Sequence, residues 1–365
     1  MLDKKKFYIN GEWVDPKSNQ TINIINPATE DVCAEISLGN KDDVNEAVQS
    51  AKTAFKTWAF STKEERLAPL EKLYELYKKR WADIAEAITL EMGAPKDFAT
   101  KLQAGTGAAH IKTFIRYLKE FNFEKPLGEH AKNQRIIYEP KGVCALITPW
   151  NWPMNQTCLK VMPAIASGCT MVLKPSEVAP LSAMILAELI HEAKFPKGVF
   201  NLVNGDGTHT GDALTSHPDI NMISFTGSTR AGALISQNAA KDFKRVSLEL
   251  GGKGANIIFK DADPKAIERG ALRCFRNSGQ SCNAPTRMLV EKSMYSQAVE
   301  RVKQFANEMK VGDPNKEGEH IGPVVSEIQY KKIQSLIQKG IDEGATLVAG
   351  GIGKPDGIEK GYFVK

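Results

Sequence analysis

The sequence predicts an α/β protein built on an open parallel sheet, and three features of its 365 residues carry that prediction. From Gly142 onward, short apolar runs suited to buried parallel strands alternate with helical segments. This alternation predicts right-handed βαβ crossovers, with helices on both faces of the sheet. The chain is also longer than one hydrophobic core usually supports, so we expect at least two lobes with a cleft between them.

Composition and charge exclude several classes of protein. With 42% hydrophobic and 25% charged residues the composition is ordinary for a globular protein, and no apolar run approaches the roughly 20 residues that span a bilayer. The net charge of +5 is dispersed among acidic residues, which argues against a nucleic-acid partner. The N-terminal MLDKKKFYINGEWV has neither the apolar stretch nor the cleavage site of a signal peptide, so we expect a cytoplasmic protein without membrane contact.

The cysteines predict neither a metal site nor a disulfide framework, because they form no CxxC pair and have no histidine at metal spacing. We expect no bound metal. Most of the cysteines are expected to be small buried side chains in a reducing compartment. The six are Cys33, Cys144, Cys158, Cys169, Cys274 and Cys282.

The predicted elements follow from hydrophobic periodicity. After a hairpin-like N-terminal stretch, apolar residues at three and four spacing predict helices over Asp42–Ala59, Lys63–Met92 and Ala104–Leu118. The next part predicts four strands and a helix: Val143–Ile147, Thr170–Leu173, Val199–Val203, Met222–Phe225, and helix Ser182–Lys194. A second βα series after Glu249 is assigned to another lobe and includes Thr286–Glu291, Met294–Met309 and Ser326–Gly340.

Polar and glycine residues follow these strands, where parallel sheets bind ligands and where helix N-termini favour phosphate. The cluster from Gly205 to Gly211 departs by one residue from the dinucleotide fingerprint GxGxxG. Taken alone, such a cluster is equally well explained by turn chemistry.

Four segments taken in order are more specific: ITPWNWP (147–153), FTGST (225–229), LELGGK (248–253) and NSGQSCNAPTR (277–287). Their order and spacing resemble the NAD(P)-dependent aldehyde dehydrogenase superfamily, and the resemblance runs from YINGEWV to the final GYFVK. It implies a Rossmann-like NAD(P)-binding domain at 1–120 and 141–248, a partial oligomerisation flap at 121–140, and an incomplete α/β catalytic domain at 249–365.

The chemistry of the segments agrees with this resemblance. An aldehyde hydrogen leaves as hydride only from a tetrahedral adduct, so a nucleophile is needed, and a thiolate is well suited at neutral pH. Cys282 lies in the polar sequence GQSCN, which favours an accessible thiol over a buried inert one. The apolar helical patterns around Cys158 and Cys274 favour structural roles for those two cysteines.

Two further catalytic roles are implied by the resemblance. The Asn151 side-chain amide and the Cys282 backbone N–H match the donors to the oxyanion, although Asn151 also suits a turn and the two roles are compatible. Glu249 matches the general base that activates water against the thioester. A surface or salt-bridged glutamate is the alternative for Glu249.

The resemblance also implies cofactor contacts. Lys174 and Glu177 match residues at the adenosine ribose, Ser228 matches a pyrophosphate contact at a helix start, and Gln329 matches a contact to the nicotinamide-side ribose. NAD is expected because the Glu177 carboxylate would repel a 2′-phosphate, while Lys174 and Ser176 leave NADP possible. The other cofactor residues expected from the same segments are Ile147, Thr148, Pro149, Trp150, Gly207, Phe225, Gly227 and Leu250.

The expected substrate is a small-molecule aldehyde, and the residues matched to its tunnel suggest a small or polar one. They are Trp152, Gln156, Ser281 and Asn283. Family members of full length imply a homo-dimer or homo-tetramer.

Relative to the family, the sequence stops about a quarter early, before a segment with a Glu-x-Phe-Gly-Pro motif, so we expect a fragment. Two alternatives stay open at this stage. One is a coenzyme A-acylating semialdehyde dehydrogenase, although such members generally lack the glutamate at the position of Glu249. The other is a truncated, non-catalytic nucleotide-binding member.

Overall fold

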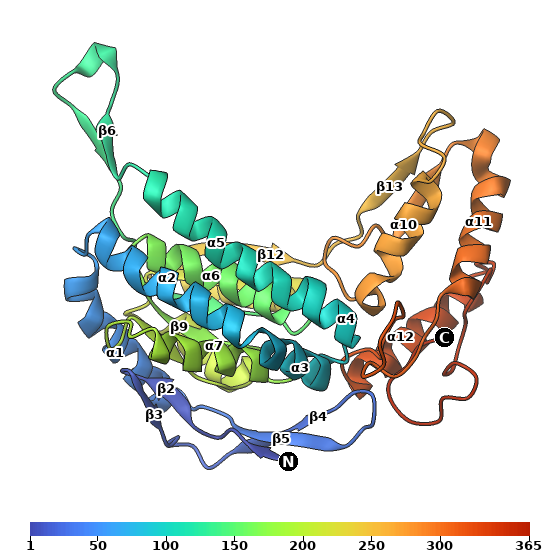
Figure 1. The fold of residues 1–365 in the computed structure, drawn as a ribbon, viewed down its shortest axis with the longest axis horizontal. Helices are drawn as coiled ribbons and strands as arrows, with labels where there is room; N and C mark the ends of the chain where they lie inside the picture. The colour runs from blue at the N-terminus through green and yellow to red at the C-terminus, as the bar shows by residue number, and fades with distance from the viewer.

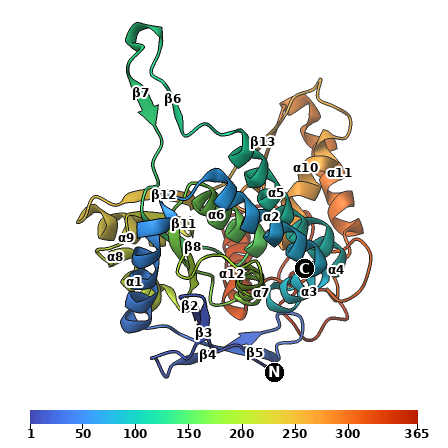
Figure 2. The same ribbon diagram turned by 60° about the vertical axis from the view of Figure 1, so that its left-hand side comes forward.

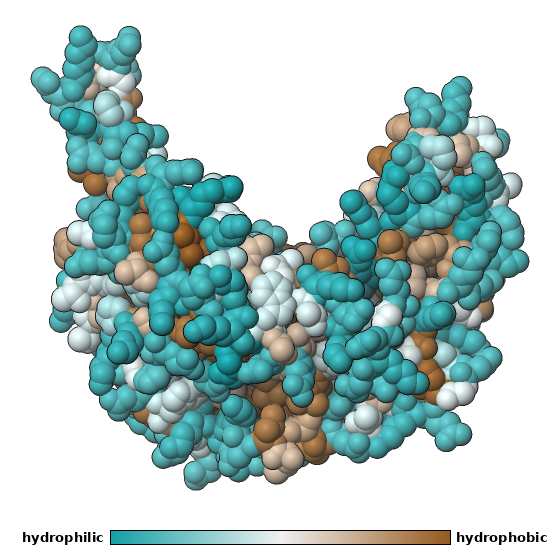
Figure 3. Space-filling view, viewed as in Figure 1, coloured by the Kyte–Doolittle hydropathy of each residue, from teal (hydrophilic) through white to brown (hydrophobic).

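The computed structural model describes residues 1–365 and shows a large lobe, a projecting arm and a second lobe. The arm and the second lobe rise from opposite ends of the large lobe, and both views show them well separated (Figures 1 and 2). In the space-filling view a wide hollow separates them, and the surface is mostly hydrophilic, with hydrophobic patches on the second lobe (Figure 3). No helix has the length and apolar character needed to cross a membrane.

A seven-stranded sheet forms the centre of the large lobe, in the order β12-β11-β8-β9-β10-β2-β3. Its five parallel strands are β8 (Val143–Ile147), β9 (Thr170–Lys174), β10 (Phe200–Leu202), β11 (Met222–Gly227) and β12 (Arg245–Leu250). The hairpin β2 (Phe7–Ile9) and β3 (Glu12–Val14) adds antiparallel strands beside β10. A three-stranded sheet nearby contains β1 (Leu2–Asp3), β5 (Val32–Ser37) and β4 (Thr21–Ile25).

Alternating side chains of the buried strand β8 divide the core into two layers. Cys144 and Leu146 face the layer formed by α2 (Lys63–Lys79), α3 (Trp81–Met92), α5 (Ala104–Glu120), α6 (Pro153–Ala166) and α7 (Leu181–Glu192). Val143, Ala145 and Ile147 face the layer formed by α1 (Lys41–Trp58), α8 (Asp212–Ser216) and α9 (Thr229–Ala240). The sheet therefore has helices on both faces, as predicted.

The arm is a two-stranded antiparallel ribbon, β6 (Glu124–Pro126) with β7 (Arg135–Ile137), inside the segment predicted to be a flap. The second lobe has the parallel pair β13 (Ala255–Ile258) and β14 (Arg287–Val290), with α10 (Ala266–Phe275), α11 (Tyr295–Glu308) and α12 (Glu327–Asp342). Its sheet has apolar side chains that are half exposed or more, including Ile257 at 58% and Leu289 at 51%. The assignment of these parts as functional domains stays a prediction.

Short helical segments complete the chain. They are α4 (Lys96–Phe98), π-helices at Ala99–Gln103 and Gly207–Gly211, and 3₁₀-helices at Glu129–Ala131 and Lys292–Met294. Arg276–Gly279 is a tight turn in which Asn277 and Ser278 do not have right-handed helical geometry.

The predicted strand at Val143–Ile147 coincides with β8, and the other three predicted strands differ from β9, β10 and β11 by one or two residues at an end. The single helix predicted over Lys63–Met92 is wrong, because the chain bends at Arg80 and forms α2 and α3. Arg80 leaves helical geometry, and its guanidinium donates to Glu188 of α7 at 3.3 Å. This contact accompanies a change of direction that packs α3 against α7.

Helix α7 is capped by a residue far away in the sequence. Its own N-cap, Pro180, supplies no side-chain hydrogen bond. Instead, the fully buried Glu91 of α3 accepts from the backbone N–H groups of Leu181 and Ser182, and from the Ser182 hydroxyl at 2.6 Å. Burial raises the pKa of Glu91 to about 7, although these hydrogen bonds act in the opposite direction.

This buried carboxyl predicts a pH-dependent stability. The folded pKa exceeds the ordinary value of 4.5, so the unfolded chain loses the proton first and stability falls as pH rises from about 5 to about 7, by roughly 3 kcal/mol. Glu91→Gln stays neutral throughout, so its Tm relative to wild type should rise between about pH 5 and pH 8. Circular dichroism melts measure this difference, with the exposed Glu120→Gln as control. A Tm difference that stays constant with pH would contradict the prediction.

Candidate functional site

The carboxyl ends of β8 and β11 form the position where a ligand is expected. From β8 the chain extends the sheet on one side through β9 and β10, and then crosses to the other side to add β11 and β12. The strand order therefore reverses between β8 and β11, and such a switch point leaves a crevice beyond the strand ends. The segments 147–152 and 225–228 border this crevice.

The loop that carries Cys282 is attached to the end of β8. The Asn151 side-chain amide donates to the carbonyl of Gln280 at 2.9 Å, two residues before Cys282. The Trp152 indole N–H donates to the Ser281 hydroxyl at 2.9 Å. Cys282 itself is exposed. The structure thus brings two predicted site residues, Asn151 and Trp152, against the cysteine loop. A third predicted site residue, Ser281, is part of that loop.

The remaining predicted substrate residues differ in position. The Gln156 side-chain carbonyl accepts from the Thr226 hydroxyl at 3.1 Å, which directs it toward the end of β11. Asn283 is exposed and follows Cys282 in the loop. The ring of Trp152 packs on Phe98 of α4, with ring centroids 5.4 Å apart.

Glu249 lies at the crevice on the edge strand β12, in register with Thr226 of β11. Its side chain is exposed. Lys160 of α6 is a neighbour that the sequence analysis missed: it is 7% exposed, and its ammonium donates to the Ser224 hydroxyl at 3.0 Å. Burial lowers the pKa of Lys160 to about 8, while the charge of Glu249 raises it. The charges of Lys160 and Glu249 therefore interact, although the hydrogen bond of Lys160 goes to Ser224.

The sequence held one signal for Lys160. It lies in phase with Pro153, Thr157 and Ala164 on the buried side of α6, where a lysine is out of place unless it has a partner.

A second polar group lies at the end of β9. Lys174 is buried, with its ammonium donating to the carbonyls of Pro175 and Gly205 and to the Glu177 carboxylate at 3.5 Å. Burial lowers the pKa of Lys174, and the Glu177 charge opposes that shift. The Glu177 side chain keeps 36% of its surface exposed, so its carboxylate can accept hydrogen bonds from a ligand's hydroxyls. Ser176 is 7% exposed beside them.

The start of α9 provides a site suited to phosphate. Ser228 caps this helix, accepting from the Ala231 N–H at 3.2 Å, and helix N-termini attract anions. A Cβ atom on Gly227 would lie 2.4 Å from the ring of Phe225 on the same strand, so a larger residue would require that ring to move. Ile147 pairs with both Phe225 and Lys174 across the sheet, so these predicted cofactor residues share one edge. The arrangement fits a dinucleotide with a diol and a pyrophosphate.

Other predicted cofactor residues are more dispersed. Thr148 is buried, and its N–H donates to Lys174, whereas Pro149 and Trp150 are half-buried in the loop after β8. Gly207 opens the π-helix after β10 with open space beside it, and Leu250 ends β12. Gln329 lies in the first turn of α12, in the other lobe.

The other cysteines differ from Cys282 in their surroundings. All six are free, and Cys144, Cys158 and Cys169 are buried. Burial raises the pKa of Cys158 far above its ordinary range, which makes it inert as a nucleophile. Cys33 and Cys274 are half-buried. No group of three or more His, Cys, Asp or Glu side chains is placed to hold a metal ion.

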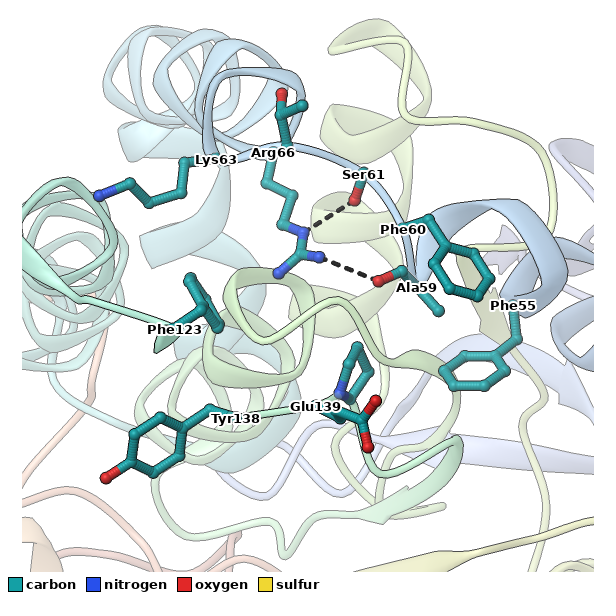
Figure 4. Close-up of a pocket in the computed structure, with 11 residues that line it drawn as sticks. Phe55, Ala59, Phe60, Ser61, Lys63, Arg66, Phe123, Tyr138 and Glu139 are labelled. Atoms are coloured by element: carbon teal, nitrogen blue, oxygen red, sulfur yellow. Dashed lines mark hydrogen bonds between the residues drawn. The ribbon is translucent and has the colours of Figure 1, made fainter. Parts of the chain in front are cut away.

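A separate hollow of about 480 Å³ lies at the base of the arm, and its lining includes Phe60, Arg66, Phe123 and Tyr138 (Figure 4). The Arg66 guanidinium donates to the Ser61 hydroxyl at 2.8 Å and to the Ala59 carbonyl at 3.3 Å, as drawn in Figure 4. Because none of the predicted site residues lines this hollow, it is distinct from the site at β8 and β11.

Comparisons with known proteins agree with this geometry. The model of the aldehyde dehydrogenase family matches residues 13–365. The 3-succinoylsemialdehyde-pyridine dehydrogenase of a Pseudomonas species is 49% identical over 367 residues, which cover 100% of this chain and 76% of that protein. The crystal structure of an aldehyde dehydrogenase from Bartonella henselae has a TM-score of 0.99 and 57% identity, covering 100% of this chain and 76% of that one.

A third similar protein was crystallised with ligands. It is a cysteine-to-alanine mutant of aldehyde dehydrogenase C from Pseudomonas syringae, in complex with NAD+ and octanal. Its TM-score is 0.96 at 46% identity, over 99% of this chain and 74% of that one.

Fold and site together define an α/β protein with a parallel sheet whose strand ends are suited to a dinucleotide. More specifically, the chain belongs to the aldehyde dehydrogenase family, whose members oxidise aldehydes with NAD(P). The family, the enzyme class and the nicotinamide cofactor predicted from the sequence are thereby confirmed.

Proposed function

We propose that the protein oxidises an aldehyde to a carboxylate through a thioester on Cys282. The observation that carries this proposal is the attachment of an exposed cysteine loop to Asn151, at the switch point of the sheet. The Cys282 thiolate forms a bond to the aldehyde carbon and the carbonyl oxygen becomes an oxyanion. Loss of hydride from that carbon leaves the thioester.

Asn151 is placed to serve both the loop and the oxyanion. Its amide has two N–H groups, and one donates to Gln280. The second can donate to the oxyanion beside Cys282, together with the Cys282 backbone N–H. A donor in this role is worth about 3 kcal/mol in the transition state.

Glu249 acts in the second half of the reaction. Its carboxylate takes a proton from water, the resulting hydroxide attacks the thioester carbon, and the carbon–sulfur bond breaks to return the Cys282 thiolate. The exposed position of Glu249 gives water access, and the charge of the Lys160 ammonium acts on this part of the site.

Bound NAD supplies the hydride acceptor. We assign the diol of its adenosine ribose to Glu177 and Lys174, and its pyrophosphate to the start of α9 at Ser228, because these groups fit that chemistry at one edge of the sheet. Gln329, in the second lobe, is assigned to the nicotinamide-side ribose. Lys174 and Ser176 are the residues that would also allow the 2′-phosphate of NADP to bind.

We assign Trp152, Gln156, Ser281 and Asn283 to the aldehyde, which we expect to be small or polar because one large ring is combined with polar groups. A homo-dimer or homo-tetramer, formed with the arm, is the expected assembly. A cytoplasmic location remains the expectation from the sequence.

The first test replaces the nucleophile. Cys282→Ala should bind NAD with unchanged Kd, because nearly all the assigned cofactor residues belong to the large lobe, and should lose aldehyde oxidation. Calorimetry and NADH absorbance measure the two effects. Cys274→Ala, the matched control, should keep activity because that thiol is half-buried. Retained turnover by Cys282→Ala would contradict the assignment of Cys282 as the nucleophile.

The second test separates the two halves of the reaction. Glu249→Gln should slow thioester hydrolysis by about 10² to 10⁴, as expected for a lost general base, while acylation continues. Stopped-flow should show a burst of about one NADH per active site, followed by slow turnover. Mass spectrometry of the quenched protein should find the acyl group on the Cys282 peptide.

The control for this test is Glu120→Gln, an exposed carboxylate at the end of α5. Loss of the burst in Glu249→Gln would mean that Glu249 activates the thiol instead. Product formation that depends on added coenzyme A would favour the acyl-transfer alternative.

The third test concerns cofactor choice. Glu177→Gln removes the charge that would repel a 2′-phosphate, so the preference for NAD over NADP should narrow. The ratio of kcat/KM values for the two cofactors measures this, with Glu192→Gln on the following helix as control. An unchanged ratio would show that another group selects the cofactor.

A further inference from the structure

Gln103 is a buried amide that connects the helical layer of the large lobe to the cysteine loop. It ends the π-helical turn Ala99–Gln103, which is closed by a hydrogen bond from the Ala104 N–H to the Ala99 carbonyl. The residue is 0% exposed. One-turn π-helices are frequent at functional sites, because the extra residue redirects the side chains that follow.

The Gln103 amide nitrogen donates to two residues of the candidate site. It lies 3.1 Å from the Asn151 carbonyl and 3.2 Å from the Asn277 side-chain oxygen. Asn277 itself donates to the same Asn151 carbonyl at 2.9 Å and to the Gln280 carbonyl at 3.3 Å. The Asn151 carbonyl therefore accepts hydrogen bonds from two side-chain amides, one from each lobe.

Hydrogen bonding fixes the orientation of both amides. A backbone carbonyl only accepts, so both Gln103 and Asn277 must turn their nitrogens toward Asn151. The Asn277 side-chain oxygen then faces the Gln103 nitrogen. This oxygen requires a donor, and the Gln103 N–H is that donor. Turning either amide over would place two acceptors, or two donors, against each other.

This network ends two residues from the proposed nucleophile. The Gln280 N–H and side-chain amide both donate to the Asn277 carbonyl, at 3.0 and 3.2 Å, and the Gln280 side-chain oxygen accepts from Val325 at 2.9 Å. Asn277 and Ser278 have φ of 57° and 55°, in the left-handed region that non-glycine residues rarely adopt. The loop therefore depends on its hydrogen bonds to keep this conformation.

The oxygen of the Gln103 amide is unfavourable for stability, which suggests that the amide is present for its donor. Its side-chain oxygen is buried and has no hydrogen-bond partner. A buried polar atom without a partner is destabilising, and an apolar side chain of the same length would avoid that cost. The same amide nitrogen also lies 3.6 Å from the Met92 sulfur, a weak acceptor that an apolar side chain can contact as well.

We propose that Gln103 is a positioning residue for aldehyde oxidation: its amide fixes the main chain of Asn151 and, through Asn277, the conformation of the Cys282 loop. This inference rests on the proposed roles of Cys282 and Asn151. It predicts that removing the donor harms chemistry while leaving stability and cofactor binding intact.

The main test is Gln103→Met, which keeps the shape and removes the donor. Its Tm should stay close to that of wild type, because the unpartnered Gln103 oxygen is removed while the buried Asn277 oxygen loses its donor. The burst rate of NADH formation should fall about 10- to 100-fold, the usual effect of a small misplacement of reacting groups, with unchanged NAD Kd. Backbone hydrogen exchange in the peptide 277–284 should accelerate, a readout that needs no turnover.

A second variant tests the donor directly. The carboxylic acid in Gln103→Glu can donate when protonated, whereas the carboxylate has no donor and faces the Asn151 carbonyl. The burst rate relative to wild type should therefore decline as pH rises. The same ratio for Gln103→Met should not change with pH, because its side chain does not titrate.

The control is Gln49→Met, the same substitution on α1, where the amide contacts Asp219. Gln49→Met should match wild type in burst rate and exchange. The positioning role is overturned if Gln103→Met keeps the wild-type burst rate and hydrogen exchange. It is also overturned if the lower burst rate of Gln103→Met is explained by unfolding, seen as a lower Tm. Turnover by Cys282→Ala would instead overturn the proposed nucleophile, so the two proposals fail separately.

Discussion

Parallel pairing of β8 with β9 on one side and β11 on the other is the constraint on which the site depends. Because all three strands run in one direction, their carboxyl ends meet at a single edge, and Ile147 is paired with both Lys174 and Phe225. The chain must leave this edge by a helix in each case. The loops before α6 and α9 therefore converge, and they bring the Asn151 turn and the Ser228 cap to the same crevice.

This constraint explains which parts of the fold were predictable from the sequence. The strand at 143–147 is buried on both faces, so every residue is apolar or small and its limits are clear in the sequence. The helix predicted over Asp42–Ala59 differs from α1 by one residue at each end, and in the structure a local capping box of Asn40 with Asp43 sets its start. The break at Arg80 was not predictable, because it accompanies a contact with Glu188 that is distant in sequence.

The residues of the candidate site also separate into those that the sequence predicts and those that only the folded structure reveals. Cys282, Glu249 and Asn151 could be proposed from the sequence because they lie in motifs and suit the steps that aldehyde oxidation requires. Lys160, Gln103 and Asn277 were missed because their importance lies in partners brought together by folding, over separations of 48 residues or more for the contacts of Gln103. A buried amide in a helix gives no pattern of its own, and single-sequence periodicity assigns it to the core.

The same long-range contacts account for a costly feature of the cysteine loop. A non-glycine residue in the left-handed region costs of order 1 kcal/mol or more, and Asn277 and Ser278 both adopt it. The hydrogen bonds of the Asn277 side chain offset the conformational cost at Asn277. At Ser278 the cost is offset by the hydroxyl, which donates to the Gly322 carbonyl at 2.7 Å. Gly279, with φ of 73°, then continues the turn without steric cost. Three consecutive left-handed residues reverse the chain sharply after α10, which returns Gln280 to Asn151 and leaves Cys282 exposed at the crevice. The left-handed turn and the polar network therefore depend on each other: neither would hold the proposed nucleophile in place without the other.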